Sequence, residues 1–121
     1  MCDFNIIYNV KPLSYYKTIR KSKFGMYVTK EGRVFRKIIK DLTEDKMKVE
    51  DFCCVSDDVE MTVIFYHDNR RCNDLDNSFK TIGDCLNKIL YDDDKQIKRL
   101  ILEKKYDKKC PRIELSMKKY E

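Results

Sequence analysis

The segment that most constrains the fold is Val59–His67, an uninterrupted run rich in β-branched and aromatic residues. Such a run favours a β-strand in the middle of a sheet. On each side of it, apolar residues recur at spacings of three and four, which predicts amphipathic helices from about Lys30 to Leu42 and from about Asp76 to Leu90. Since each helix has one apolar face to bury, we expect a sheet covered by two helices.

Further strand patterns lie towards both ends of the chain. We expect strands at Phe4–Val10, Met26–Val28, Ile97–Tyr106 and Arg112–Tyr120. A basic hairpin connection should join the last two of them. Residues 14–25 and the acidic stretch 41–58 are predicted to be connections, and Thr29 is a plausible N-cap for the first helix.

Together these elements predict the α+β class. The expected architecture is a two-layer sandwich of a small mixed β-sheet and two helices, in a single domain that covers residues 1–121. The chain is long enough for one core of ordinary size. With 42% hydrophobic and 39% charged residues, it is not typical of disordered proteins.

The sequence also bears on location and on redox state. No apolar run approaches the length of a membrane span, and the N-terminus lacks the pattern of a secretory signal. The six cysteines include no C-x-x-C pair and His67 is the single histidine, which excludes the usual spacing of a zinc site. We interpret Cys53, Cys54 and Cys85 as small, reduced core residues. We therefore expect a cytoplasmic protein with no membrane partner.

The net charge of +5 is assembled from blocks of opposite sign. Lys and Arg outnumber Asp and Glu by 10 to 2 in residues 1–40 and by 9 to 4 in residues 97–121, whereas acidic residues prevail in between. Basic ends around an acidic centre suit a protein that holds a polyanion with Lys and Arg and presents carboxylates to a metal. Solvated faces of opposite charge are the alternative explanation.

Two groups of aspartates flank the second predicted helix. Asp74 and Asp76 precede it as a D-x-D pair, and the run Asp92–Asp94 follows its end. Carboxylates bind Mg²⁺ and Mn²⁺, and two such ions about 4 Å apart can activate a water and stabilise the leaving oxygen of a phosphodiester. Alternatively, the pair caps the helix and the run forms a solvated turn. A calcium loop is excluded, because Phe79 and Cys85 stand where it needs Gly and Glu.

The pattern around these aspartates resembles the RusA-type Holliday junction resolvases, or crossover junction endodeoxyribonucleases. The motif is D-x-D-N-x-x-K followed by D-D-x-Q-I/V, and the matching residues are Asp74, Asp76, Asn77, Lys80, Asp93, Asp94, Gln96 and Ile97. Further similar segments are Gly25–Gly32, Phe35–Arg36, Arg70–Arg71 and Asp84–Leu86. The resemblance therefore runs from about Lys11 to Leu115.

This resemblance implies a homodimeric, Mg²⁺-dependent endonuclease. Such an enzyme binds four-way junction DNA and resolves it by paired, symmetric nicks, in recombination and repair. By the family pattern, Asp74, Asp76 and Asp94 are the catalytic, metal-binding carboxylates, and Asp93 beside them is a further metal ligand. Mn²⁺ is the alternative to Mg²⁺ as the cofactor.

The family pattern also gives Lys80 a role, that of the catalytic cation. A lysine one helical turn after Asp76 can lie against the scissile phosphate and offset its developing charge. An ion pair within the helix, with Asp76 or Asp84, is the alternative. Gln96, two positions after Asp94, favours Asp94 over Asp92 as the metal ligand.

Contacts to DNA are predicted from charge. The candidates are Arg70, Arg71, Lys17, Arg20, Lys21 and Lys23. The last four lie in a loop whose aromatic residues Tyr15, Tyr16 and Phe24 could stack on unpaired bases at a junction centre. A mobile basic loop held by an aromatic anchor is the alternative.

Two other functions stay open at this point. One is a non-catalytic nucleic-acid-binding protein of the same fold, which predicts salt-sensitive DNA binding without a product. The other is a metal-dependent nuclease for other branched or single-stranded DNA, which a panel of substrates would separate.

Overall fold

The computed structural model describes residues 3–70 and 74–121, and of Tyr15 and Tyr16 it describes the backbone alone. Within these ranges the chain forms a four-stranded sheet, in the order β1-β6-β4-β5, and a separate two-stranded sheet. The strands of the main sheet are β1 (Phe4–Tyr8), β4 (Val59–His67), β5 (Ile97–Tyr106) and β6 (Arg112–Lys119). β6 runs antiparallel to β1 and β4, whereas β4 and β5 are parallel. The predicted central strand, β4, is thus confirmed.

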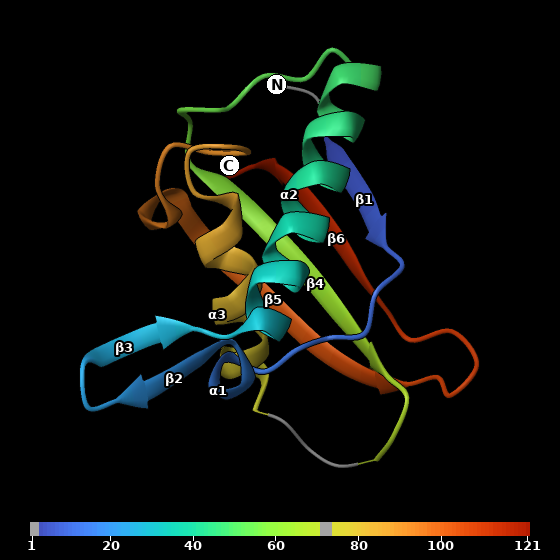
Figure 1. Ribbon diagram of the computed structural model, residues 1–121. Helices are drawn as coiled ribbons and strands as arrows, with labels where there is room; N and C mark the ends of the chain where they lie inside the picture. Colours follow the sequence, from blue (N-terminus) through green and yellow to red (C-terminus); the bar gives the residue numbers. More distant parts are fainter. Residues whose placement is uncertain (1–2, 71–73) are drawn as a thin grey trace.

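Two helices, α2 (Lys30–Val49) and α3 (Leu75–Leu86), lie over one face of this sheet (Figure 1). Along β4 the side chains alternate strictly between buried and half-buried, because the helices cover only one face. The predicted α+β fold, with a mixed sheet and two covering helices, is confirmed. In the described ranges, no helix combines the length and the apolar character needed to cross a membrane.

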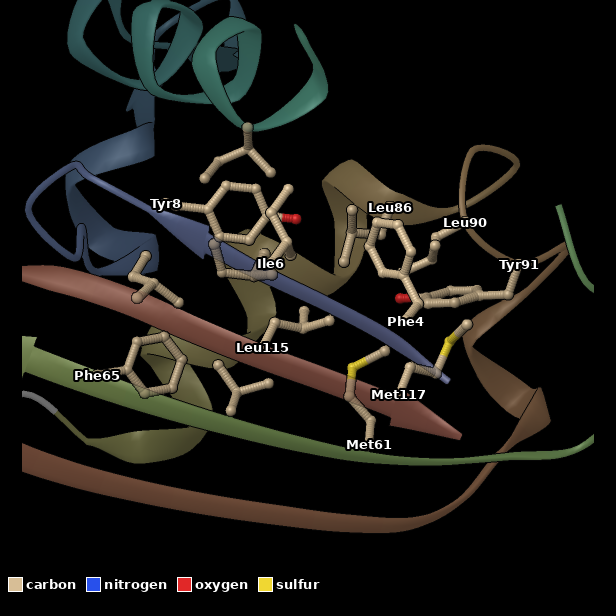
Figure 2. Close-up of a cluster of buried hydrophobic side chains, with 14 of the residues drawn as sticks. Phe4, Ile6, Tyr8, Met61, Phe65, Leu86, Leu90, Tyr91, Leu115 and Met117 are labelled. Atoms are coloured by element: carbon tan, nitrogen blue, oxygen red, sulfur yellow. The ribbon is translucent and has the colours of Figure 1, made fainter. Parts of the chain in front are cut away.

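The hydrophobic core fills the space between the sheet and the helices (Figure 2). Its fully buried side chains include Phe4, Tyr8, Ile39, Met61, Phe65, Ile82, Leu86, Leu115 and Met117. Burial of a side chain of this size stabilises the fold by about 1.5–3 kcal/mol. β5 is an edge strand and adds only the half-buried Ile97 and Leu102 to this core. The core therefore rests on β1, β4 and β6 and on the two helices.

The first helix begins where the sequence predicts and ends later. Thr29 is its N-cap, and its side-chain oxygen accepts a hydrogen bond of 3.0 Å from the backbone N–H of Gly32. The helix continues past Leu42 to Val49. The interpretation of residues 41–58 as a connection is therefore wrong for their first half.

Thr43 explains this longer helix. It is fully buried on the inner face of α2, and its hydroxyl donates a hydrogen bond of 2.7 Å to the carbonyl oxygen of Ile39. The hydroxyl of Tyr8 lies 2.7 Å from the same Thr43 oxygen. The buried stripe of the helix thus continues through a polar residue, which interrupts the apolar pattern in the sequence.

Residues 14–25 are also more ordered than predicted. They contain the one-turn helix α1 (Tyr15–Thr18) and β2 (Ile19–Ser22). β2 pairs with β3 (Gly25–Val28), which confirms the strand expected at Met26–Val28. The two form a hairpin that projects from the body of the molecule (Figure 1). Since β2 has no buried face, its sequence lacks the alternation that marks a strand.

The predicted hairpin between β5 and β6 is wrong. These strands follow each other in the sequence, but β4 lies between them and pairs with both. The connection 107–111 therefore crosses the end of β4, where the backbone N–H of Asp107 donates a hydrogen bond of 2.8 Å to the carbonyl oxygen of His67. Alternation within a strand predicts the strand itself, and it does not identify its neighbours.

Two smaller expectations need correction. α3 ends at Leu86 rather than near Leu90, because the backbone of Lys88 adopts a positive φ of 67°, which a helix does not accommodate.

Cys53 and Cys54 are exposed free thiols rather than core residues, since they lie in the irregular segment between α2 and β4. Cys85 is half-buried and also a free thiol.

Candidate metal and nucleic-acid site

The first acidic group lies at the N-terminal end of α3. Asp74 occupies the N-cap position with an extended backbone, but its side chain makes no capping hydrogen bond. Asp76, in the first turn, accepts a hydrogen bond of 3.0 Å from the backbone N–H of Asn77. Both aspartates are exposed. Capping therefore does not explain Asp74, and both carboxylates face solvent at the positive end of the helix dipole.

Lys80 lies on the outer side of the same helix. It is exposed, one turn after Asp76 and one turn before Asp84. Residues four apart share a helix face, so these three side chains form one polar stripe. The opposite side of α3 carries the fully buried Ile82 and Leu86, which hold this stripe outward.

The second acidic group lies in the turn after α3, at the start of the short 3₁₀ helix η1 (Asp94–Gln96). Tyr91 is fully buried, and its hydroxyl donates a hydrogen bond of 3.1 Å to the carbonyl oxygen of Gly83. This bond ties the turn to the C-terminal half of α3. Asp93, the N-cap of η1, and Asp94 are therefore held near that end of the helix.

Gln96 positions these two aspartates. It is only 8% exposed, and its Oε1 accepts a hydrogen bond of 2.8 Å from the backbone N–H of Asp93, as part of a capping box. Its Nε2 donates to the carbonyl oxygens of Val55 and Asp57, at 3.0 and 2.9 Å. One amide side chain thus anchors η1 to the segment that enters β4. This explains why a glutamine belongs in the motif.

Asp93 and Asp94 are adjacent, exposed carboxyl groups whose pKa values are shifted in opposite directions. A backbone hydrogen bond from Lys95 and a hydrogen bond with Asp94 lower the pKa of Asp93. The pKa of Asp94 is raised, first by the hydrogen bond with Asp93, then by burial, and then by the charges of Asp93 and Asp84. As the pH falls, Asp94 therefore takes up a proton before Asp93 does. Divalent cations compete with such a proton for carboxylate oxygens, so the pair fits a hard cation.

Asp92 has a different environment. Its carboxylate accepts hydrogen bonds from the hydroxyl of Ser56 at 2.8 Å and from the thiol of Cys54 at 3.5 Å. Burial, and then the hydrogen bond with Asp92, raises the pKa of that thiol. Asp92 thus fastens the turn to the segment before β4. These contacts favour Asp94 over Asp92 as a metal ligand.

Within one chain, the two acidic groups lie towards opposite ends of α3. Asp76 and Asp84 are eight residues apart, which corresponds to about 12 Å along the helix axis, and the charge of Asp84 helps to raise the pKa of Asp94. Among residues 3–70 and 74–121, no three acidic, His or Cys side chains are placed to hold a metal ion. The chain brings together Asp93 and Asp94, and it does not bring them to Asp74 and Asp76.

Asp84 was expected from the sequence as a partner for Lys80 on α3, and the structure also relates it to Asp94. It is exposed in the last turn of α3, and its charge helps to raise the pKa of Asp94. Its spacing of four from Lys80 was the available signal. That spacing does not reveal the turn fixed by Tyr91, which brings Asp94 back towards α3.

The cationic candidates lie in two places. Arg70 follows β4, and its guanidinium carbon lies 4.6 Å from the centre of the Tyr106 ring. Arg71 lies outside the described residues. The other candidates are exposed on α1, on β2 and at the tip of the hairpin: Lys17, Arg20, Lys21 and Lys23. The β2–β3 hairpin is thus a cationic projection.

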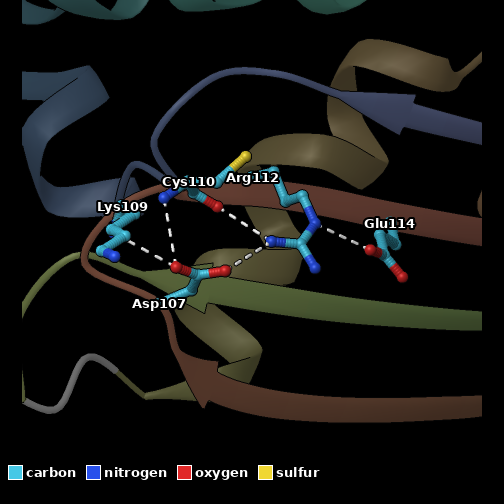
Figure 3. Close-up of polar contacts among 5 residues, drawn as sticks. All are labelled: Asp107, Lys109, Cys110, Arg112 and Glu114. Carbon is cyan, nitrogen blue, oxygen red and sulfur yellow. Dashed lines mark hydrogen bonds and ion pairs between the residues drawn. The ribbon is translucent and has the colours of Figure 1, made fainter.

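A network around Arg112 orders the connection between β5 and β6 (Figure 3). Arg112 pairs with Asp107 at 2.9 Å and with Glu114 at 2.8 Å, and its guanidinium lies 3.7 Å from the centre of the Tyr66 ring. The guanidinium lowers the pKa of Asp107. The other carboxylate oxygen of Asp107 accepts hydrogen bonds of 3.1 Å from the backbone N–H groups of Lys109 and Cys110. The lysines of this connection are therefore carried on an ordered loop.

Carboxylates that can bind a divalent cation, a lysine and a cationic hairpin are the residue types that metal-dependent cleavage of DNA requires. The family model described as endodeoxyribonuclease RusA matches residues 9–118. The chain therefore belongs to the RusA endodeoxyribonuclease family, whose members resolve Holliday junctions. This confirms the resemblance seen in the sequence and makes the chain a DNA-binding hydrolase of branched DNA. No curated protein matches the chain closely enough to serve as a relative.

Proposed function

We propose that this chain resolves four-way DNA junctions by paired, symmetric nicks, through Mg²⁺-dependent hydrolysis of phosphodiester bonds. Membership of the RusA family supports the class of reaction. The observation that carries the finer proposal is the turn with Asp93 and Asp94, where Gln96 binds the backbone N–H of Asp93 and two adjacent carboxyl groups are exposed. The charge of Asp93 raises the pKa of Asp94, and a bound cation would offset this repulsion.

Asp93 and Asp94 are the first metal ligands of this proposal. Asp74 and Asp76 are the further ligands, by their match to the family motif. When bound there, Mg²⁺, or Mn²⁺ in its place, would polarise a phosphoryl oxygen of the DNA and lower the pKa of a bound water. The carboxylates orient these groups, and Asp94 is ionised above its raised pKa.

Lys80 provides positive charge next to the reacting phosphate. It shares the outer stripe of α3 with Asp76, so a phosphate held near that carboxylate lies within reach of the lysine. Its ammonium group offsets the charge that develops on the phosphate oxygens. Arg70, Arg71 and the cations of the hairpin bind flanking phosphates, which position the DNA without reading its sequence.

We also propose that residues 1–121 form one domain that acts as a homodimer. Two opposed strands must be cut, and a two-fold dimer supplies one site for each strand. The separation of the two acidic groups within one chain supports a second copy, since a single chain forms no complete ligand set in its described part. The free thiols of Cys54, Cys85 and Cys110 suit a reducing, intracellular location.

The direct test is cleavage of a labelled synthetic four-way junction in Mg²⁺, beside a linear duplex of the same sequence. We expect symmetric nicks in the junction alone, and none in EDTA. Asp76→Asn should abolish the product. Asp45→Asn is the matched control, because Asp45 is an exposed aspartate on α2 outside the motif, and this variant should cut normally.

The alternatives predict other results. Equal cutting of the duplex would overturn the selectivity for junctions. Salt-sensitive binding of DNA without a product in either Mg²⁺ or Mn²⁺ would instead indicate a non-catalytic binding protein. Preferential cutting of flaps or single strands would indicate a nuclease for other DNA structures.

A further inference from the structure

The tip of the β2–β3 hairpin presents an aromatic ring to solvent. Phe24 is 90% exposed, so the fold gains almost nothing from its apolar surface. On the next strand, Met26 and Tyr27 are 65% and 51% exposed. Packing within the chain therefore does not account for the phenylalanine at this position.

The turn that carries Phe24 is ordered by local hydrogen bonds. The hydroxyl of Ser22 donates to the carbonyl oxygen of Gly25 and accepts from the backbone N–H of Phe24, both at 3.2 Å. Gly25 has a φ of 117°, a conformation that glycine adopts without strain. The ring is thus presented by a defined two-residue turn, Lys23–Phe24.

The base of the hairpin is fastened to α2. The backbone N–H of Thr29 donates a hydrogen bond of 2.8 Å to the carbonyl oxygen of Thr18. The hydroxyl of Thr29 donates a hydrogen bond of 2.6 Å to the carbonyl oxygen of Lys17. Gly32 lies so close that a Cβ at its position would be 2.8 Å from the backbone of Thr18. The hairpin is therefore an anchored projection, in contrast to a mobile loop.

The hairpin that carries the exposed ring also carries exposed cations. Arg20, Lys21 and Lys23 are exposed, and the Nζ of Lys23 lies 5.2 Å from the centre of the Phe24 ring. Residues 11–30 contain no acidic side chain. Cations that bind phosphates beside an aromatic ring that stacks on a base are the usual combination in proteins that bind unpaired nucleotides. The surface therefore suits DNA with accessible bases.

We propose that Phe24 is a wedge that stacks on a base at the branch point of a four-way junction, while Arg20, Lys21 and Lys23 bind the phosphates around it. This rests on the proposed function and adds a source for its selectivity. Inserting a ring into a continuous duplex requires unstacking of a base step, whereas the stacking is already interrupted at a branch point. The wedge therefore favours junctions over linear DNA.

The test is DNA binding in EDTA, which prevents cutting. The ligands are a four-way junction with the fluorescent base 2-aminopurine at the branch point and a linear duplex of the same sequence. Wild-type protein should bind the junction more tightly and change the fluorescence of that base. Phe24→Ala should weaken junction binding about tenfold, the loss of one stacking contact, and leave duplex binding within about twofold. Phe24→Trp should restore both binding and the fluorescence change.

Two control variants separate stacking from charge and from general effects. Lys23→Ala should weaken binding to both DNAs by a similar factor, since both contain phosphates. Val49→Ala should leave binding to both DNAs unchanged, because Val49 is 82% exposed and lies at the end of α2 that is far from the hairpin.

The outcomes distinguish this wedge from the function on which it rests. Suppose that the wild type cuts junctions, but Phe24→Ala weakens binding to the junction and to the duplex equally, or weakens neither. The wedge is then overturned and the proposed function stands. If the wild type neither prefers nor cuts the junction, the proposed function is overturned and the wedge with it.

Discussion

The hydroxyl of Tyr91 is hydrogen-bonded to the carbonyl oxygen of Gly83 at 3.1 Å, and this contact folds the turn after α3 back onto the helix. Tyr91 is fully buried, so the position of the turn is set from the core. Asp93 and Asp94 follow within three residues, and their mutual distance is fixed by the same turn. The candidate metal ligands are thus positioned by packing and not by a loop alone.

Removing this hydroxyl should loosen the turn. Tyr91→Phe keeps the ring in the core and deletes one buried hydrogen bond, so we expect a loss of about 1 kcal/mol in the free energy of unfolding. Urea denaturation followed by circular dichroism measures this loss. An unchanged midpoint would contradict the role of the bond. Junction cutting should fall in the same variant, because the acidic pair is less well held.

The acidic pair should make stability depend on pH. The pKa of Asp94 is raised, so the folded protein binds this proton more tightly than the unfolded chain does, and the resulting stabilisation is present at low pH and is lost as the pH rises through that pKa. Asp94→Asn removes the repulsion with Asp93. We therefore expect a higher melting temperature than that of the wild type at pH 7 and little difference at pH 3. A lower melting temperature at pH 7 would contradict repulsion between Asp93 and Asp94.

Mg²⁺ should act on the same pair. A ligand that binds only the folded protein raises its melting temperature. We expect Mg²⁺ at neutral pH to stabilise the wild type and to have a much smaller effect on Asp94→Asn. Asp45→Asn is the matched control and should respond as the wild type does.

Substitutions of Asp92 and of Asp94 should have different effects on stability and on cutting, although the two residues are only two positions apart. Asp92→Ala breaks the hydrogen bonds with Ser56 and Cys54, which should cost about 1 kcal/mol of stability and leave cutting within about threefold of the wild type. Asp94→Asn should reduce cutting by about a hundredfold or more. Single-turnover cleavage and thermal melting of both variants measure these effects. The reverse pattern would assign the metal to Asp92.

The buried pair of Tyr8 and Thr43 tests how α2 is held to the sheet. Thr43→Val leaves the hydroxyl of Tyr8 buried without its partner and should cost about 1–3 kcal/mol. Tyr8→Phe should also destabilise, and the double variant should be less destabilised than the sum of the two. A coupling energy of about 1 kcal/mol in this cycle would support the bond, and strict additivity would contradict it.

The parts of the fold that bury an apolar face were predictable from the sequence. Val59–His67 alternates between faces along the whole of β4, and the apolar spacing after Thr29 and after Asp76 marks the two helices. The second half of α2 was not predictable, because its inward stripe passes through Thr43. β2 was not predicted either. A strand without a buried face carries no alternation of apolar and polar residues.

The candidate site, too, was only partly predictable from the sequence. The motif identifies the aspartates and Lys80, because their residue types and spacing are local properties of the chain. It does not show that Asp93 and Asp94 are placed by Gln96, whose hydrogen bonds reach Val55 and Asp57. Contacts over such separations depend on the folded chain. The sequence thus places aspartates at both ends of the helix, and the structure adds the hydrogen bonds that fix the turn of Asp93 and Asp94.

The most direct test of the account is the action of the wild-type protein on a supercoiled plasmid with an extruded cruciform, in Mg²⁺. Two symmetric nicks across the four-way junction convert the plasmid to a linear molecule, whereas a single nick gives an open circle. We predict linear product with ends at the cruciform base, and none in EDTA or with Asp76→Asn. Open circles alone, or linear product from a plasmid without the cruciform, would contradict paired resolution of junctions by this chain.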